Sequence, residues 1–390
     1  MKNDRPVDEP GFGVYLHWPY CAAICPYCAF NVYRDRGEER AALIDALRQD
    51  LTGWRERTGA KPLRSIYFGG GTPSRMPPEA VARLIEDCRS LWTPEDDVEI
   101  SLEANPDDCT LERLSALADA GVNRLSIGVQ ALDDHALSDL GRWHSAADAR
   151  AAVERALSVF DRVSIDLISM RPGQTLHAWR AEIGEAASWG VEHLSIYELT
   201  IEPGTAFERR ARRGELPAAD DERGAAFFEA TNEACTAAGF DAYEISNHAR
   251  GPAARSAHNL IYWRSGEWVG VGPGAHGRLG PLGGARIATA AARSPTDYIA
   301  AVEASGWSVA EEEELDGQAQ LEETLLMGLR LAEGVPLARL EQIESAKISP
   351  NALERLERDG FLTRSEGRLA ATKEGRPLID RIVLELIDDR

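Results

Sequence analysis

Long apolar runs, cysteines and basic residues are all scarce in this chain of 390 residues. No apolar stretch approaches the roughly 20 residues that a membrane-crossing helix needs, so we expect no membrane span and only peripheral contact with any membrane protein. Six cysteines in so long a chain do not form a disulfide framework. The net charge of -21 argues against a protein that binds nucleic acid through charge. The start Met1–Pro6 lacks the apolar core of a secretory signal, which predicts a cytoplasmic protein.

Short strand patterns alternate with longer amphipathic helix patterns over the first two thirds of the chain. The strands are predicted at Val14–His17, Ser65–Phe68, Val98–Glu103, Arg124–Val129, Val163–Ile168, His193–Glu198 and Asp241–Ile245. The helices are predicted at Glu38–Arg57, Pro78–Leu91, Leu111–Ala120, Ala146–Phe160, Leu176–Trp189 and Asp220–Ala238. This alternation predicts an α/β fold with a parallel sheet of about six units, arranged as a partial (β/α)6 barrel or, alternatively, as a doubly wound sheet.

The character of the sequence changes twice beyond these units. Residues 247–316 are rich in Gly, Pro and Ala and give few clear elements. Further helices are then predicted at Ala319–Ala332, Leu337–Glu344 and Pro350–Arg358, followed by a hairpin of Phe361–Arg364 and Arg368–Ala371. We therefore divide the chain into a barrel (1–246), an extension (247–316) and a winged-helix-like domain (317–390). The acidic segments Glu311–Glu314 and Asp388-Asp389 favour docking or a lid over DNA binding for this last domain.

Three of the six cysteines, Cys21, Cys25 and Cys28, lie within eight residues in the loop that follows the first predicted strand. Soft thiolates at this spacing suit an iron–sulfur cluster or zinc. Structural zinc normally has four ligands, and Phe30 stands where a further cysteine would be expected. The sequence therefore favours a [4Fe–4S] cluster with one iron left open. The alternatives are a zinc site completed by His17 and a set of unrelated buried cysteines.

The segment His17–Phe30 resembles the cluster loop of the radical S-adenosylmethionine (SAM) superfamily. The resemblance implies that the amino and carboxylate groups of SAM chelate the open iron, and that an electron from the cluster cleaves SAM to a 5'-deoxyadenosyl radical. It also implies the partial barrel. Gly69–Ser74 follows the second predicted strand and is similar to the family's loop that pairs with the SAM amino group. Taken alone, this glycine run is equally typical of a tight turn.

Polar residues end several of the predicted strands, where ligands gather in parallel α/β folds. Singly, such residues are more often capping or surface groups. Together they resemble the oxygen-independent coproporphyrinogen III oxidases and their relatives over nearly the whole chain. The resemblance implies a SAM site lined by Tyr15, Tyr27, Gly70, Gly71, Thr72, Glu103, Gln130, Arg142 and Asp166.

Two departures point from these oxidases to a heme chaperone branch of the same family. The oxidases carry a further cysteine where this chain has Phe30, and they have a longer N-terminal extension. The segment His258–Trp263 is similar to the HNxxYW heme-binding motif of the chaperone branch, which implies iron ligation by His258 with Tyr262 beside the porphyrin. A structural histidine packed by aromatic rings is the alternative, and His276 is a weaker ligand candidate.

Another departure concerns the loop that follows Ile168. Relatives carry a glycine where this chain has Met170. The added Cβ predicts a rearranged loop, which puts any substrate contact assigned to it in doubt.

Our leading hypothesis is a cytoplasmic heme chaperone that binds heme and a SAM-liganded [4Fe–4S] cluster and transfers heme to an acceptor protein. The alternative is an enzyme, an oxygen-independent coproporphyrinogen III oxidase that forms protoporphyrinogen IX by radical oxidative decarboxylation. A zinc-stabilised binding module is the third hypothesis.

Overall fold

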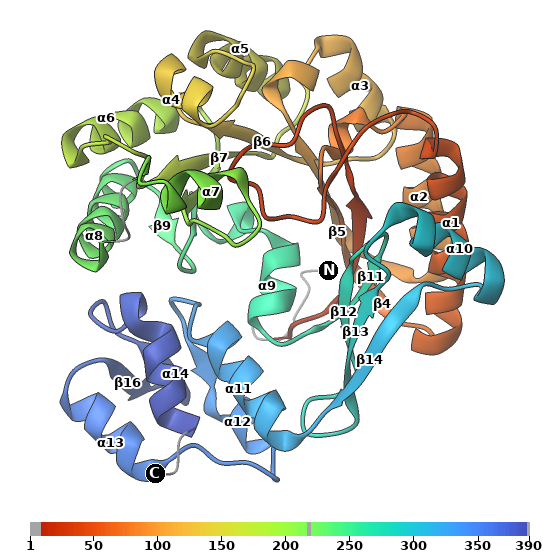
Figure 1. Ribbon diagram of the computed structural model, residues 1–390. Coiled ribbons are helices and arrows are strands. Elements are labelled where there is room, and N and C mark those ends of the chain that lie inside the picture. Colours follow the sequence, from red (N-terminus) through yellow and green to blue (C-terminus); the bar gives the residue numbers. More distant parts are fainter. Residues whose placement is uncertain (1–8, 217–219, 388–390) are drawn as a thin grey trace.

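The computed structural model describes residues 9–216 and 220–387, so Met1–Pro6 and Asp388-Asp389 lie outside the described residues. A curved sheet of twelve strands forms the larger part of the molecule (Figure 1). Its strand order is β14-β13-β12-β11-β1-β4-β5-β6-β7-β8-β10-β9. The six central strands run parallel and are β1 (Phe12–Trp18), β4 (Pro62–Gly70), β5 (Thr93–Ala104), β6 (Arg124–Gln130), β7 (Val163–Ser169) and β8 (His193–Glu198).

These six strands lie side by side in the order of the chain. A doubly wound sheet would instead reverse its order around the first strand. The prediction of a partial (β/α)6 barrel is therefore confirmed, and the doubly wound alternative was wrong.

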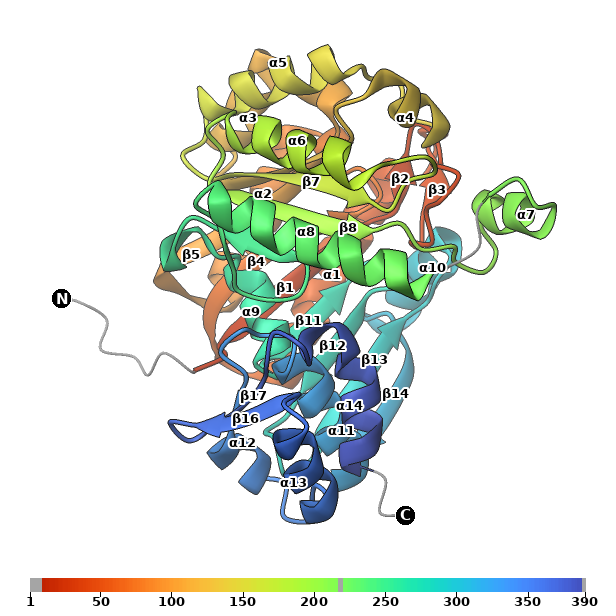
Figure 2. The ribbon, with the colours of Figure 1, turned by 90° about the vertical axis from the view of Figure 1, so that its left-hand side faces the viewer.

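Helices cover the outer face of this barrel (Figures 1 and 2). They are α1 (Arg40–Thr58), α2 (Pro78–Leu91), α3 (Leu111–Asp119), α4 (Asp134–Asp139), α5 (Ala146–Leu157), α6 (Leu176–Ala187) and α8 (Asp221–Ala237). The short helix α7 (Ala206–Arg212) instead projects from the barrel after β8 (Figure 2). Side chains alternate along β1, so that Val14 and Leu16 belong to the buried core while Tyr15 and His17 line a cavity on the inner face. The inner face of the barrel is thus left open for polar chemistry.

Residues 247–316, which give few clear elements in the sequence, continue the same sheet. They form β10 (Asn247–Ala249), α9 (Ala257–Trp263), β11 (Glu267–Val271), β12 (His276–Leu279), β13 (Arg286–Ala291), α10 (Pro295–Ser305) and β14 (Val309–Leu315). Strand β11 pairs in parallel with β1, and β12 to β14 follow it in antiparallel order. The expectation of few regular elements in this segment was therefore wrong.

The seventh predicted strand, Asp241–Ile245, was also wrong. Only Asp241–Ala242 forms a strand, β9, which pairs antiparallel with β10. The buried carboxylate of Glu244 interrupts the strand because it accepts a hydrogen bond from the backbone N–H of Ser246 at 3.0 Å and another from the side chain of Asn247. Such local side-chain bonds compete with strand pairing.

The C-terminal part forms a separate core beneath the barrel (Figure 2). It consists of α11 (Gly317–Gly328), β15 (Val335–Pro336), α12 (Leu337–Glu341), α13 (Pro350–Arg358), β16 (Leu362–Ser365), β17 (Arg368–Ala371) and α14 (Ile379–Ile387), with a small antiparallel sheet in the order β15-β17-β16. Helices combined with a hairpin are the arrangement that the sequence predicted here. Within residues 9–216 and 220–387, no helix is both long and apolar enough to cross a membrane.

Candidate cluster and cofactor site

The cysteine loop, residues 19–35, leaves the carboxyl end of β1 and is held at several points. Two short strands, β2 (Tyr20–Cys21) and β3 (Tyr33–Arg34), pair in parallel across its base. The side chain of Asn31 donates hydrogen bonds to the carbonyl of Pro273 at 2.9 Å and to that of Arg293 at 2.8 Å. The loop is therefore fixed by a segment more than 240 residues further along the chain.

All three cysteines of this loop line one cavity of about 500 Å³ at the carboxyl ends of the barrel strands. Eight of the nine predicted SAM-site residues line the same cavity: Tyr27, Gly70, Gly71, Thr72, Glu103, Gln130, Arg142 and Asp166. The ninth, Tyr15, does not line it, and neither do His258 and Tyr262 of the predicted heme motif. The predicted residues around the cysteines thus come from five strand ends and meet in one space.

Arg142 connects the cysteine loop to the strand ends. Its guanidinium donates to Sγ of Cys25 at 3.5 Å, to Oδ1 of Asn105 at 2.6 Å and to the carbonyl of Gly128 at 3.0 Å. Asn105 also donates to the hydroxyl of Thr72 at 3.3 Å. Asn105 was not among the predicted site residues, although its position shortly after Glu103 at a strand end is the signal that could have identified it.

Two partly buried carboxyl groups face the cavity, and both have a pKa above the usual value. Burial raises the pKa of Glu103 to about 7 and the pKa of Asp166 to about 6. Glu103 accepts hydrogen bonds from the Tyr67 hydroxyl at 2.8 Å and the Gly70 N–H at 3.1 Å, and Asp166 accepts one from the Ser126 hydroxyl at 3.0 Å. A cationic or hydroxylated ligand would find acceptors there that are already oriented.

The glycine run after β4 is required by the packing of the cysteine loop. A Cβ on Gly71 would lie 2.8 Å from both the carbonyl carbon of Pro19 and the carbonyl oxygen of Tyr20, and neither backbone atom can move independently. Gly70 adopts a φ of +111°, which favours glycine. The glycine run therefore packs directly against the backbone of the cysteine loop. Backbone atoms rather than side chains form this part of the cavity wall.

The residues present fit an iron–sulfur cluster. Three thiols share one cavity with a guanidinium, and burial raises the pKa of Cys21 to about 11 and also raises the pKa of Cys28. Such thiols hold their protons until a metal centre displaces them, since metal coordination deprotonates a thiol outright.

The zinc alternative requires His17, and this imidazole is already engaged. Its Nδ1 lies 2.9 Å from the Tyr15 hydroxyl and its Nε2 lies 2.9 Å from the carbonyl of Asn31. In the described part of the chain, no three His, Cys, Asp or Glu side chains converge in the way that would hold a single metal ion. A zinc site completed by His17 is therefore not supported by this arrangement.

The remaining predicted residues lie on the inner face of the barrel, away from the cysteines. Tyr15 and Tyr262 line a second cavity that adjoins the first. His258, on α9, is only 1% exposed. Its Nδ1 lies 2.7 Å from the Ser65 hydroxyl and its Nε2 lies 2.6 Å from the Tyr262 hydroxyl, so both ring nitrogens are occupied. These contacts are what the alternative of a packed structural histidine predicts, and heme ligation by His258 stays a prediction.

The loop after β7 accommodates Met170 in a conformation that glycine adopts more easily. Met170 has a φ of +62°. The start of this loop remains hydrogen-bonded to the end of β8, because the N–H of Leu199 donates to the carbonyl of Ser169 at 3.0 Å. An ion pair between Arg171 and Glu182 closes the loop on its far side.

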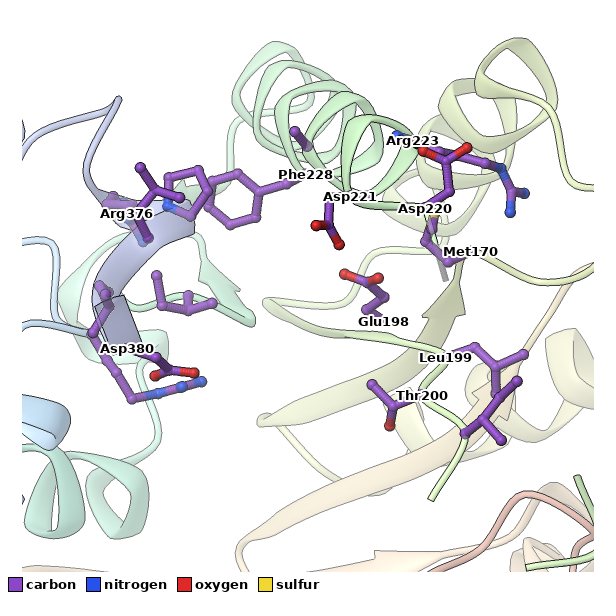
Figure 3. A pocket seen from close by; sticks show the side chains of 18 of the residues that line it. Met170, Glu198, Leu199, Thr200, Asp220, Asp221, Arg223, Phe228, Arg376 and Asp380 are labelled. Carbon is purple, nitrogen blue, oxygen red and sulfur yellow. Dashed lines mark hydrogen bonds between the residues drawn. The ribbon is translucent and has the colours of Figure 1, made fainter. Parts of the chain in front are cut away.

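A further cavity of about 700 Å³ lies between the barrel and the C-terminal domain, and Met170 is part of its wall (Figure 3). The carboxylates of Glu198 and Asp221 point toward one another across it, whereas Arg376 and Asp380 enter from the C-terminal domain. Because the segment after β8 lines both this cavity and the cysteine cavity, the two spaces adjoin.

Comparison with protein families gives two matches along the chain. Residues 15–184 match the radical SAM superfamily, and residues 315–378 match the HemN C-terminal domain. The first match covers the cysteine loop and most of the strands that line its cavity, but not β8. The second covers most of the C-terminal domain.

Curated relatives are similar over nearly the full length. The heme chaperone HemW of Mycobacterium tuberculosis is 36% identical over 99% of this chain and 99% of its own length. The heme chaperone HemW of Bacillus subtilis is 35% identical over 93% of this chain and 96% of its own. The mitochondrial radical S-adenosyl methionine domain-containing protein 1 of Bos taurus is 36% identical over 99% of this chain and 92% of its own.

The fold has a match among solved structures. Coproporphyrinogen III oxidase (HemN) from Escherichia coli, described as a radical SAM enzyme, superposes with a TM-score of 0.81 over 97% of this chain and 91% of that one. The sequence identity is 21%, so this likeness bears on the fold and not on the activity.

Proposed function

Because this chain belongs to the radical SAM superfamily and, within it, to the group of the heme chaperone HemW, we propose that it binds heme and delivers it to an acceptor protein. We also propose that Cys21, Cys25 and Cys28 hold a [4Fe–4S] cluster and that SAM binds beside it. The observation that carries the proposal is the single cavity in which these cysteines meet the glycine run and the polar strand ends.

Each part of that cavity has a role in this proposal. The bound cluster supplies an open iron for the amino and carboxylate groups of SAM and a source of single electrons. Gly71 gives the ligand a wall of bare backbone, and Arg142 orients Cys25 through its contact to the sulfur. Glu103 and Asp166 offer oriented acceptors, and their raised pKa values, about 7 and about 6, bring their titration closer to neutral pH.

Removing one sulfur ligand tests the cluster. After anaerobic reconstitution, we expect the wild-type protein to contain iron and acid-labile sulfide in the ratio of a [4Fe–4S] cluster. Cys25→Ala should lose most of both, because two thiolates cannot retain the cluster. Cys235→Ala is the matched control, since Cys235 is buried and lines no part of this cavity, and it should load normally. Zinc in place of iron and sulfide would contradict the proposal.

Heme binding is tested by titrating the protein with hemin. We expect a saturable shift of the Soret band, and a protein that leaves the hemin spectrum unchanged would not be a heme chaperone.

The second candidate function is the oxygen-independent coproporphyrinogen III oxidase, because residues 315–378 match the HemN C-terminal domain. An anaerobic assay with reductant, SAM and coproporphyrinogen III separates the two functions. Sustained formation of protoporphyrinogen IX would replace the chaperone by the oxidase. Location in the cytoplasm stays a prediction.

A further inference from the structure

A second cavity, of about 620 Å³, adjoins the cysteine cavity on the inner face of the sheet. It lies over β1 and the added strands β11 to β14, and the wall that it shares with the cysteine cavity includes Gly70 and Glu103. Phe30, whose side chain is 70% exposed, lines both cavities. The volume lies in the range of about 300 to 1,000 Å³ that small-molecule and cofactor sites occupy.

His276, the first residue of β12, presents a free imidazole to this cavity. Its side chain is exposed, and its ring nitrogens form no hydrogen bond with any described residue. Partial burial and the nearby Arg278 lower its pKa, so that the ring is neutral and carries a lone pair at pH 7. His258 differs in exposure and in hydrogen bonding, because both of its nitrogens are occupied and its ring is enclosed.

Aromatic rings form the side of the cavity next to His276. The rings of Tyr262 and Trp268 are in contact, with centroids 4.5 Å apart. The indole N–H of Trp268 donates to the backbone carbonyl of His276 at 2.9 Å, which holds this ring beside the imidazole. A large planar ligand could lie against these rings and against the exposed ring of Phe30.

The charged groups of the cavity suit a ligand that carries carboxylates at one edge. The guanidinium of Arg293 lines the cavity and forms no ion pair with a described residue. Glu311 also lines it, in register with His276 across three strands, with the small Ala290 between them. A carboxylate would therefore settle on the side of Arg293 and away from Glu311.

We propose that this second cavity is the heme site and that His276, rather than His258, is the protein ligand to the heme iron. The inference rests on the proposed function and gives it a location. The imidazole lone pair forms a dative bond to the iron, and no electron is transferred. Tyr262 and Trp268 lie against the porphyrin, and Arg293 pairs with a propionate.

The test is a hemin titration of four proteins: wild type, His276→Ala, His258→Gln and His135→Ala. His135 is the control because its side chain is 87% exposed and lines neither cavity. We expect His276→Ala to weaken hemin binding at least tenfold and to lose the spectrum of a histidine-ligated iron, and added imidazole to restore that spectrum. His258→Gln and His135→Ala should keep it.

The outcomes separate this inference from the proposed function. If wild type binds no hemin, the chaperone proposal itself fails. If wild type binds and His276→Ala gives the same affinity and spectrum, His276 is not the ligand while heme binding stands. Loss of the spectrum in folded His258→Gln alone would return the ligand to His258.

A second measurement tests the position of the ligand in the cavity without changing iron ligation. Wild type should bind hemin more tightly than its dimethyl ester, which has no carboxylates. Arg293→Gln should lose this preference and retain the histidine-ligated spectrum. An unchanged preference in Arg293→Gln would overturn the assignment of the propionate to this cavity.

Discussion

The buried imidazole of His258 should give the folding of this protein a specific dependence on pH. Burial lowers its pKa from 6.5 to about 3 in the folded chain, and unfolding restores the ordinary value. Below pH 6.5 the unfolded state therefore binds a proton that the folded state does not. The contribution of neutral His258 to the free energy of unfolding is complete above pH 6.5 and is lost progressively as the pH falls toward about 3.

The size of the effect follows from the two pKa values. A pH of 5 lies about 1.5 units below the pKa of the imidazole in the unfolded chain. Each unit corresponds to about 1.36 kcal/mol, so the free energy of unfolding falls by about 2 kcal/mol. Glu103 and Asp166 act in the opposite direction, because their pKa values are raised in the folded state. A single pH curve of the wild type therefore mixes these effects, and a variant is needed to separate them.

The variant is His258→Gln, whose amide can still bond to Ser65 and Tyr262 but does not titrate. We would measure urea unfolding of the heme-free proteins at pH 7.5 and pH 5 by circular dichroism. Between these pH values the wild type should lose about 2 kcal/mol more than the variant. An exposed-site control, His135→Gln, should behave as the wild type does. Equal losses in wild type and His258→Gln would refute a buried, neutral imidazole.

Two other substitutions follow from packing, and urea unfolding measures both. Arg171→Leu leaves the carboxylate of Glu182, which is 9% exposed, without its cation. This variant should lower the free energy of unfolding by about 3 to 5 kcal/mol, whereas the double variant with Glu182→Leu should recover most of the loss. A double variant as unstable as the single one would contradict this pairing. Gly71→Ala should destabilise the folded protein by about 1 to 3 kcal/mol, because the new Cβ meets backbone atoms. Gly184→Ala is the control in α6, where no atom lies within 4 Å of the new Cβ, and it should stabilise the folded protein by about 0.5 to 1 kcal/mol. Equal effects at both glycines would refute the clash.

The barrel units were predictable because their helices and strands carry strong local signals. Pro78–Leu91 and Pro350–Arg358 begin at a proline and were predicted at the residues where the structure has them. The cysteine spacing and the polar strand ends likewise predicted most of the residues that line the cavity, since parallel strands bring their carboxyl ends to one edge of the sheet.

The strands beyond residue 247 were not predictable from local signals. Strand β14 contains Glu311–Glu314, and glutamate disfavours strands. It forms because it lies at the edge of the sheet, where it pairs with β13 on one side and where charged side chains are commonly found. The burial of His258 also could not be predicted from local signals. The packing of the short helix α9 against the barrel decides which of its side chains are buried.

The neighbours of β1 have a consequence for the time at which the proposed cluster could be loaded. This first strand lies between β4 and β11, so one of its edges stays open until the ribosome has made residue 271. The cysteine loop waits longer, since Asn31 depends on the carbonyls of Pro273 and Arg293. During synthesis the three thiols therefore emerge early but gain their final positions only when about three quarters of the chain exists. Loading of the proposed cluster would accordingly follow the synthesis of most of the chain.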